Sequence, residues 1–203
     1  MSKAVMLSVR PKWCEKIASG EKTIEVRKTR PKLETPFKCY IYCTQASVRY
    51  QTICGCKVLN SDELYRHPEQ GIKHGYSIEL MLCENYTKDN FLNGKVIGEF
   101  TCDRIDRLAP ANEPYGIYDI DDDYVLQTCL ENGALWDYGH GTPLYGWHIS
   151  NLKIYDTPKE LSKFSRPFEN CIDKVCDEFG CASCENGGHI KRPPQSWCYV
   201  EAM

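Results

Sequence analysis

Gly20-Glu21-Lys22-Thr23-Ile24-Glu25-Val26-Arg27 is the stretch on which the fold prediction for this chain depends. A glycine turn leads here into a short strand. Because side chains alternate across a strand, the residues at odd positions from Thr23 to Arg27 would share one face, while the two aliphatic side chains between them enter a core. Lys22 lies at the turn. The stretch predicts a compact group of amine, carboxylate and guanidinium that suits a polyanion or a polar heterocycle; the alternative is a solvated face with weak ion pairs.

The spacing of the charged residues also carries a resemblance. The pattern Gly-x-Lys-x-x-Glu-x-Arg, which follows a predicted strand and helix, resembles the signature of the ASCH domain family in the PUA-like group. All four signature positions are filled, by Gly20, Lys22, Glu25 and Arg27. The resemblance implies an α+β fold, a PUA-like small β-barrel of about five or six strands flanked by short helices. It also implies a cleft beside the signature that holds RNA or a nucleotide.

Length and composition favour one domain without a membrane span. A chain of 203 residues can bury a sizeable core as a single domain, 1–203, with insertions. No run of about 18 apolar residues occurs, which excludes a transmembrane helix and a membrane partner. The apolar stretch within residues 1–10 is too short for a signal peptide, so we expect a cytoplasmic protein.

Charge is unevenly distributed along the chain. The net charge is −3, but residues 1–57 contain 12 Lys and Arg against four Glu, a net charge of +8, which leaves −11 for the remainder. This basic third predicts a patch for phosphates, unless its side chains spread around the barrel and form no patch.

Alternating and helical patterns divide the chain into elements and insertions. Strands are predicted at 5–9, 24–27, 37–44, 53–59, 94–105, 147–155 and 197–201, with a short helix from Pro11 to the stop at Gly20. Helical or Cys-rich insertions are expected at about 60–93, 110–140 and 165–190. In the first, residues 77–91 have helical spacing. In the second, the acids at 119–123 would begin a helix at 124–130, because its dipole favours them there; a metal-binding cluster is the alternative.

The thiols suggest two different roles. The 13 cysteines are odd in number, and those inside predicted strands, such as Cys39 and Cys43, would be reduced and act as small hydrophobes. Near the C-terminus, Cys181 and Cys184 are separated by two residues, so both sulfurs can reach one tetrahedral zinc. Two further thiols lie close enough in sequence to complete four ligands. A redox pair or ordinary free thiols are the alternatives. The predicted ligands of this structural zinc are Cys171, Cys176, Cys181 and Cys184.

Three further side chains are candidates for ligand contact. Trp13 and Trp147 are aromatic rings that can stack on a base, although a residue such as Trp13 is more often a core or rim residue. His148 has an ordinary pKa that suits a general base, although a histidine beside a tryptophan is more often structural.

Some relatives of the ASCH family are hydrolases, which the resemblance brings into consideration. In small bacterial members that act as amidohydrolases on acetylated cytidine, the signature lysine is catalytic and works with a threonine three positions later; others have been described as ribonucleases. Lys22 matches that lysine, but the later position is Glu25, so Thr23 would have to supply the hydroxyl. A third catalytic glutamate is matched only loosely, by Glu113.

Two functions from different classes follow. In a binding module, Lys22 and Arg27 contact phosphate or base edges and Glu25 orients them. In a hydrolase acting on RNA or a modified nucleoside, a desolvated Lys22 acts as base with Glu25, and Arg27 stabilises an oxyanion. A third possibility is a protein-interaction role carried by the insertions.

Overall fold

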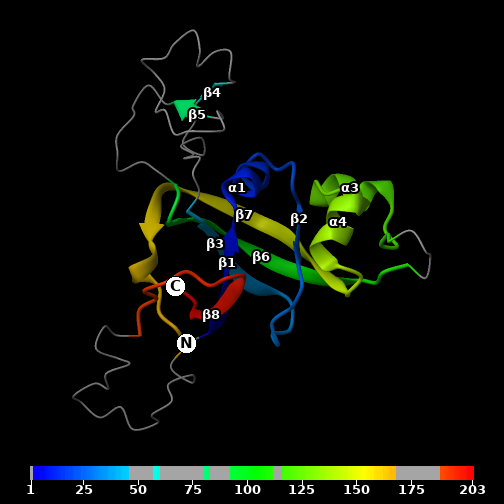
Figure 1. Ribbon diagram of the computed structural model, residues 1–203. Coiled ribbons are helices and arrows are strands. Elements are labelled where there is room, and N and C mark those ends of the chain that lie inside the picture. The colour runs from blue at the N-terminus through cyan, green and yellow to red at the C-terminus, as the bar shows by residue number, and fades with distance from the viewer. Residues whose placement is uncertain (1, 46–56, 60–79, 83–91, 112–115, 168–187) are drawn as a thin grey trace.

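The computed structural model describes residues 2–45, 57–59, 80–82, 92–111, 116–167 and 188–203. Six of its strands form one mixed sheet and two form a second, small sheet, with short helices beside them, which confirms the α+β class (Figure 1). The elements are β1 (Lys3–Val9), α1 (Pro11–Ala18), β2 (Ile24–Arg27), β3 (Phe37–Cys43), β4 (Lys57–Leu59), β5 (Leu80–Leu82), β6 (Lys95–Leu108), α3 (Asp122–Thr128), α4 (Asn132–Gly139), β7 (Leu144–Glu160), a 3-10 turn (Leu161–Lys163) and β8 (Trp197–Glu201).

The main sheet has the strand order β2-β7-β6-β3-β1-β8. β1 lies parallel to β3 and antiparallel to β8, whereas β2, β7, β6 and β3 pair antiparallel in turn. Every strand predicted within this sheet is present, and β6 and β7 are longer than predicted. The ladder between β6 and β7 shifts register at three places, which lets these two long strands bend.

Residues 4–7 of β1 are all apolar, and both faces of the strand are covered. Val5, Leu7 and Val9 enter the core beneath α1, and Ala4 and Met6 enter a second core on the opposite face. A strand buried on both sides favours such a continuous hydrophobic run. The first core also contains Trp147 and reaches the pocket described below.

The predicted closed barrel is wrong, because the sheet remains open between β2 and the β1–β8 edge. β2 has only four residues and is followed by a loop, so no strand extends along this seam to complete a ladder. Side chains cross it instead. Arg27 Nη2 donates to the Ser8 carbonyl at 2.7 Å, Trp197 Nε1 donates to Thr29 Oγ1 at 2.9 Å, and the Lys32 amide donates to the Tyr199 hydroxyl at 2.7 Å.

The second predicted insertion packs against the end of β2. α3 begins where the acids predicted it, with the Asp121 carboxylate accepting the Tyr124 amide at the N-cap. α4 was not predicted. Together with Val26 and Leu144, side chains of this segment form a third core, which fixes α3 and α4 beside the signature strand (Figure 1).

The other two insertions are described only in part. Leu80–Leu82 pairs as a strand with Lys57–Leu59, so the helix predicted over 77–91 is wrong at these three residues. The rest of that prediction, and most of 165–190, lies outside the described residues. No helix in the described part of the chain is long and apolar enough to span a membrane.

The described thiols are free, as predicted for those in strands. Cys14, Cys39, Cys43 and Cys102 are buried, and burial raises the pKa of the Cys102 thiol to about 12 and that of Cys39 well above its ordinary value. Such thiols are poor nucleophiles and act as small hydrophobic side chains.

Candidate functional site

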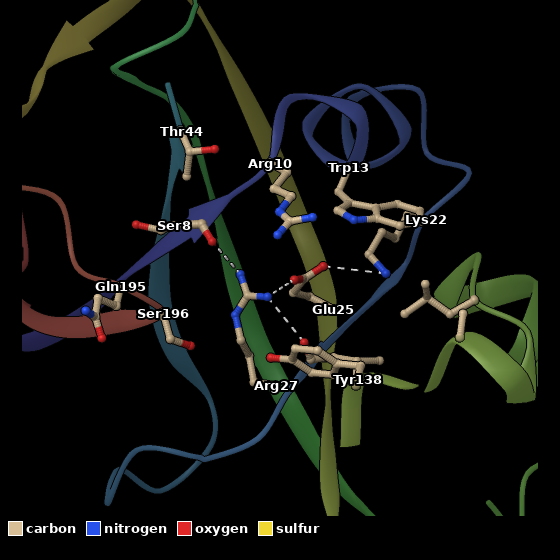
Figure 2. A pocket seen from close by; sticks show the side chains of 13 residues that line it. Ser8, Arg10, Trp13, Lys22, Glu25, Arg27, Thr44, Tyr138, Gln195 and Ser196 are labelled. Atoms are coloured by element: carbon tan, nitrogen blue, oxygen red, sulfur yellow. Dashed lines mark hydrogen bonds and ion pairs between the residues drawn. The ribbon is translucent and has the colours of Figure 1, made fainter. Parts of the chain in front are cut away.

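A pocket of about 460 Å³ opens in the seam between β1 and β2 (Figure 2). Its size falls within the range of roughly 300–1,000 Å³ typical of small-molecule sites. Residues from both sides of the seam, from α1 and from the α3–α4 segment line it. They are Ser8, Arg10, Trp13, Lys22, Glu25, Val26, Arg27, Thr44, Leu130, Ala134, Tyr138, Gln195 and Ser196.

The glycine turn places Lys22 at this pocket. Gly20 has a φ of +80°, a conformation that glycine adopts without strain, and it ends α1 as predicted. The Lys22 amide then donates back to the Lys16 carbonyl, and the Thr23 amide donates to the Gln127 carbonyl in the last turn of α3. The turn is thus held between α1 and the C-terminal end of α3.

Lys22 is the most enclosed charged group of the site, with its side chain 1% exposed. Its Nζ donates to the Thr128 carbonyl at 2.5 Å, lies 3.5 Å from Glu25 Oε2 and lies 5.1 Å from the centre of the Trp13 ring. Burial lowers the pKa of the Lys22 ammonium from its ordinary value, although the Glu25 carboxylate acts in the opposite direction.

Glu25 lies between the two cations (Figure 2). Its Oε1 forms an ion pair with Arg27 Nη1, and its Oε2 faces Lys22. Oε2 is buried and accepts no hydrogen bond within the described residues. An isolated buried carboxylate would be costly, and the two flanking cations offset that cost.

Arg27 directs most of its donors toward the protein. Nη1 contacts Glu25 Oε1 and donates to the Val26 carbonyl, and Nη2 donates to the Ser8 carbonyl. Its side chain is 11% exposed. Arg27 therefore both balances the charge of Glu25 and joins β2 to β1.

Two aromatic side chains line the pocket beside these charges. Trp13, on α1, is partly exposed, as expected for a residue that contacts a ligand. Tyr138, on α4, is 36% exposed and has Lys28 Nζ 5.0 Å from its ring centre. Figure 2 shows Trp13 and Tyr138 on different sides of Glu25. The pocket thus combines a charged wall with rings able to stack on a flat ligand.

Three predicted site residues lie elsewhere. Thr23 is exposed, precedes the first residue of β2 and does not line the pocket, so its hydroxyl is not beside Lys22. Trp147 is fully buried against Phe37 and Trp197, so the prediction that its ring stacks on a ligand is wrong. It pairs directly with Glu25 in the β2–β7 ladder and forms part of the core.

His148 is also separate from the pocket. It follows Trp147 on β7 and therefore points to the opposite face of the strand. Its Nε2 lies 2.6 Å from Asp106 Oδ2 and 2.9 Å from a guanidinium nitrogen of Arg104. These contacts on β6 and β7 agree with the structural role considered for it above.

Other contributors were missed from the sequence. Thr128 supplies a backbone carbonyl, which no side-chain pattern can reveal. Arg10 immediately precedes a helix that was predicted correctly, and the exposed Tyr138 lies on a helix that was not. The four predicted zinc ligands and Glu113 lie outside the described residues, so they stay predictions.

Several solved structures have a fold similar to that of this chain over nearly its whole length. A crystal structure of ASCH from Zymomonas mobilis is 16% identical, with a TM-score of 0.50, covering 98% of this chain and 87% of that one. Two mutant proteins from the same organism, one with tyrosine replaced by phenylalanine and one with serine replaced by alanine, are each 15% identical. Their TM-scores are 0.51 and 0.52, covering 98% of this chain and 91% and 88% of theirs.

These similarities show the fold: the chain has the ASCH-domain, PUA-like fold that the signature predicted. No family model matches the sequence, and no curated protein matches it.

Proposed function

We propose that the protein is a binding module for RNA or a nucleotide, and that the ligand enters the pocket between β1 and β2. The observation that carries this proposal is the buried row of Lys22, Glu25 and Arg27 in the wall of a pocket whose sides include Trp13 and Tyr138. Stacking on aromatic rings beside cationic groups is the usual way in which proteins hold unpaired bases.

The pocket's charge supports an anionic, planar ligand. Arg10, Lys22 and Arg27 contribute three positive charges against the single negative charge of Glu25. An uncharged apolar ligand would leave this excess unmatched, whereas a nucleotide offers both a flat ring and an anionic group.

The enclosure of Lys22 favours binding over hydrolysis. A general base must lie within hydrogen-bonding reach of the proton that it removes. Lys22 Nζ is engaged by the Thr128 carbonyl and faces Glu25, and its side chain is almost fully covered. In this conformation Lys22 organises the pocket wall and has little surface to offer a substrate.

Hydrolysis of RNA or of a modified nucleoside is the second candidate, and one observation favours it. Burial lowers the pKa of Lys22, which increases the fraction of neutral amine able to accept a proton. The hydrolase would use Lys22 and Glu25, with a hydroxyl other than that of Thr23.

The two candidates are separated by measuring binding and turnover on the same samples. Purified protein is incubated with labelled single-stranded RNA and with acetylated cytidine, beside Lys22→Ala and Lys16→Ala. Lys16 is a suitable control because its side chain is exposed, pairs with Glu21 and does not line the pocket. Affinity lost in Lys22→Ala without any turnover selects the binding module, whereas turnover lost only in that variant selects the hydrolase.

A second pair of variants protects this test against misfolding of Lys22→Ala. Tyr138 is partly exposed, so Tyr138→Leu and Tyr138→Phe should both fold. Base stacking contributes about 1–3 kcal/mol per base, so Tyr138→Leu should weaken RNA binding about 5- to 150-fold while Tyr138→Phe retains it. Equal affinity of both variants and wild type would argue against a stacked ligand, and absence of binding and turnover in wild type would remove both candidates.

A further inference from the structure

We propose that Arg10 is the anion-binding residue of this pocket, and that its ligand carries a phosphate group, on a mononucleotide or within RNA, and is not an uncharged nucleoside. The inference rests on the proposed function and deepens it. It assigns phosphate recognition to a residue outside the Gly-x-Lys-x-x-Glu-x-Arg signature. It also changes the roles first expected of Lys22 and Arg27.

Lys22 is not accessible to a phosphate. Its ammonium has three donors and is 1% exposed at the side chain. One donor is taken by the Thr128 carbonyl, and the charge is balanced by Glu25 and faces the Trp13 ring. A phosphate cannot approach this ammonium without displacing the end of α3.

Arg27 is engaged on both sides of the seam. A guanidinium has five N–H donors, and the Nη1 and Nη2 groups of Arg27 contact Glu25 Oε1 and the carbonyls of Val26 and Ser8. Its Nε is buried and has no hydrogen-bond partner within the described residues. Arg27 therefore links the two sides of the seam. Binding a phosphate through its guanidinium would break the hydrogen bond to Ser8 that joins β2 to β1.

Arg10 differs from both. It is exposed, it lines the pocket, and its side chain has no hydrogen-bond or ion-pair partner among the residues that the structure describes. Its backbone is nevertheless fixed, since its carbonyl accepts the amides of Trp13 and Cys14 at the start of α1. Arg10 thus combines a fixed backbone with a guanidinium that has no partner among the described residues.

The position of Arg10 fits a nucleotide laid across the pocket. In Figure 2 its guanidinium lies on one side of the Glu25 carboxylate and Tyr138 lies on the other. Lys22 and Arg27 are both paired with Glu25, so Arg10 is the cation of this wall that pairs with no carboxylate among the described residues. A planar guanidinium binds phosphate oxygens in a bidentate manner, which makes it the matching group for a phosphate whose base stacks at the other end.

The test compares ligands with and without phosphate. Calorimetry or fluorescence titration measures the affinity of wild type, Arg10→Gln, Arg10→Lys and Arg107→Gln for the four ribonucleosides, their 5′-monophosphates and a short single-stranded RNA. Arg107 is the matched control, because it is exposed on β6 and does not line the pocket. Hydrogen bonds to charged groups are worth enough for an expected 10- to 100-fold loss of monophosphate or RNA affinity in Arg10→Gln.

Five further results are expected. Wild type binds at least one monophosphate or the RNA more tightly than any nucleoside, and inorganic phosphate competes with that ligand. Arg10→Gln leaves nucleoside affinity unchanged, Arg10→Lys gives an intermediate loss because it keeps the charge without the fork, and Arg107→Gln behaves as wild type. Tight binding of RNA alone identifies the polymer as the source of the phosphate.

Two results would overturn the inference while the proposed function stands: equal affinity of wild type for nucleosides and monophosphates, or binding of a phosphorylated ligand that Arg10→Gln leaves intact. Failure of wild type to bind any nucleoside, nucleotide or RNA would overturn the proposed function itself, and the inference with it.

Discussion

Arg27 Nη2 donates to the carbonyl oxygen of Ser8 at 2.7 Å and so joins β2 to β1, two strands that do not pair in the sheet. The same guanidinium pairs with Glu25, which faces Lys22. The contact that holds the seam together and the charged wall of the pocket are therefore one network, and a change to either should affect the other.

Replacement of Arg27 by lysine should show that the planar guanidinium, and not only its positive charge, contributes to stability. A lysine ammonium keeps a positive charge beside Glu25 but cannot reproduce the planar set of contacts to Glu25, Val26 and Ser8. We expect Arg27→Lys to lower the free energy of unfolding by about 1–3 kcal/mol in urea denaturation. Arg107→Lys, at an exposed position, should change it by less than about 0.5 kcal/mol. Equal stability of the two variants would argue against a stabilising role for the Arg27 contacts that join β2 to β1.

Glu25 and Glu21 provide a comparison between a buried and an exposed carboxylate that lie four residues apart. Their side chains are 4% and 60% exposed, and each is paired with a lysine. Glu25→Gln leaves two enclosed cations without their anion, a loss that typically costs about 3–5 kcal/mol, whereas Glu21→Gln removes an exposed ion pair and should change stability much less. Thermal and urea unfolding of both variants measures the difference. Similar small losses would mean that water reaches Glu25.

The sequence was sufficient to predict the strands of the main sheet and the charged group. Gly20 predicted the turn, and the alternation from Ile24 to Arg27 predicted that a carboxylate and a guanidinium share a face, which the contact between Glu25 and Arg27 confirms. The signature spacing also predicted the fold that the solved structures show.

What could not be predicted depends on contacts between distant segments. The carbonyl of Thr128 reaches Lys22 across 106 positions of sequence and carries no residue-type signal. Trp147 was predicted to stack on a base as an aromatic ring flanking the site, but the neighbours that bury it, Phe37 and Trp197, lie far away in sequence. Closure of the barrel failed as a prediction because side chains, not strand pairing, bridge the seam.

The buried lysine should leave a signature in the pH dependence of stability. Because burial lowers the pKa of Lys22, the unfolded chain holds this proton up to a higher pH than the folded protein does. Between the lowered pKa and the ordinary value of 10.5, the unfolded state binds more protons, so the free energy of unfolding contributed by Lys22 rises with pH.

Urea denaturation of wild type and Lys22→Met at several alkaline pH values isolates this contribution, because other titrating groups cancel in the difference. We expect the difference to move in favour of wild type as pH rises. Lys16→Met is the control: the hydrogen bond to Glu21 raises the pKa of Lys16, so its contribution has the opposite sign and no such rise should occur. A flat difference for Lys22→Met would show that its ammonium is not desolvated in solution.

Two glycines of α4 test whether the packing of this helix sets the wall of the pocket. A Cβ at Gly139 would overlap the Tyr118 hydroxyl, which is held in place because it donates to the Thr142 carbonyl at 2.6 Å. A Cβ at Gly133 would meet nothing within 4 Å. Gly139→Ala should therefore lower the free energy of unfolding by about 1–3 kcal/mol through overpacking. Gly133→Ala should leave it unchanged or raise it by up to about 1 kcal/mol, because alanine favours the helix.

The same pair of variants links this packing to ligand binding, because α4 also carries Tyr138 and Ala134, which line the pocket. A shift of the helix away from Tyr118 moves both side chains, so Gly139→Ala should weaken RNA or nucleotide binding in a titration, and Gly133→Ala should not. The titration is made where circular dichroism shows both variants folded. Unchanged affinity of a folded, destabilised Gly139→Ala would separate α4 from the pocket, and would place recognition on α1 and β2 alone.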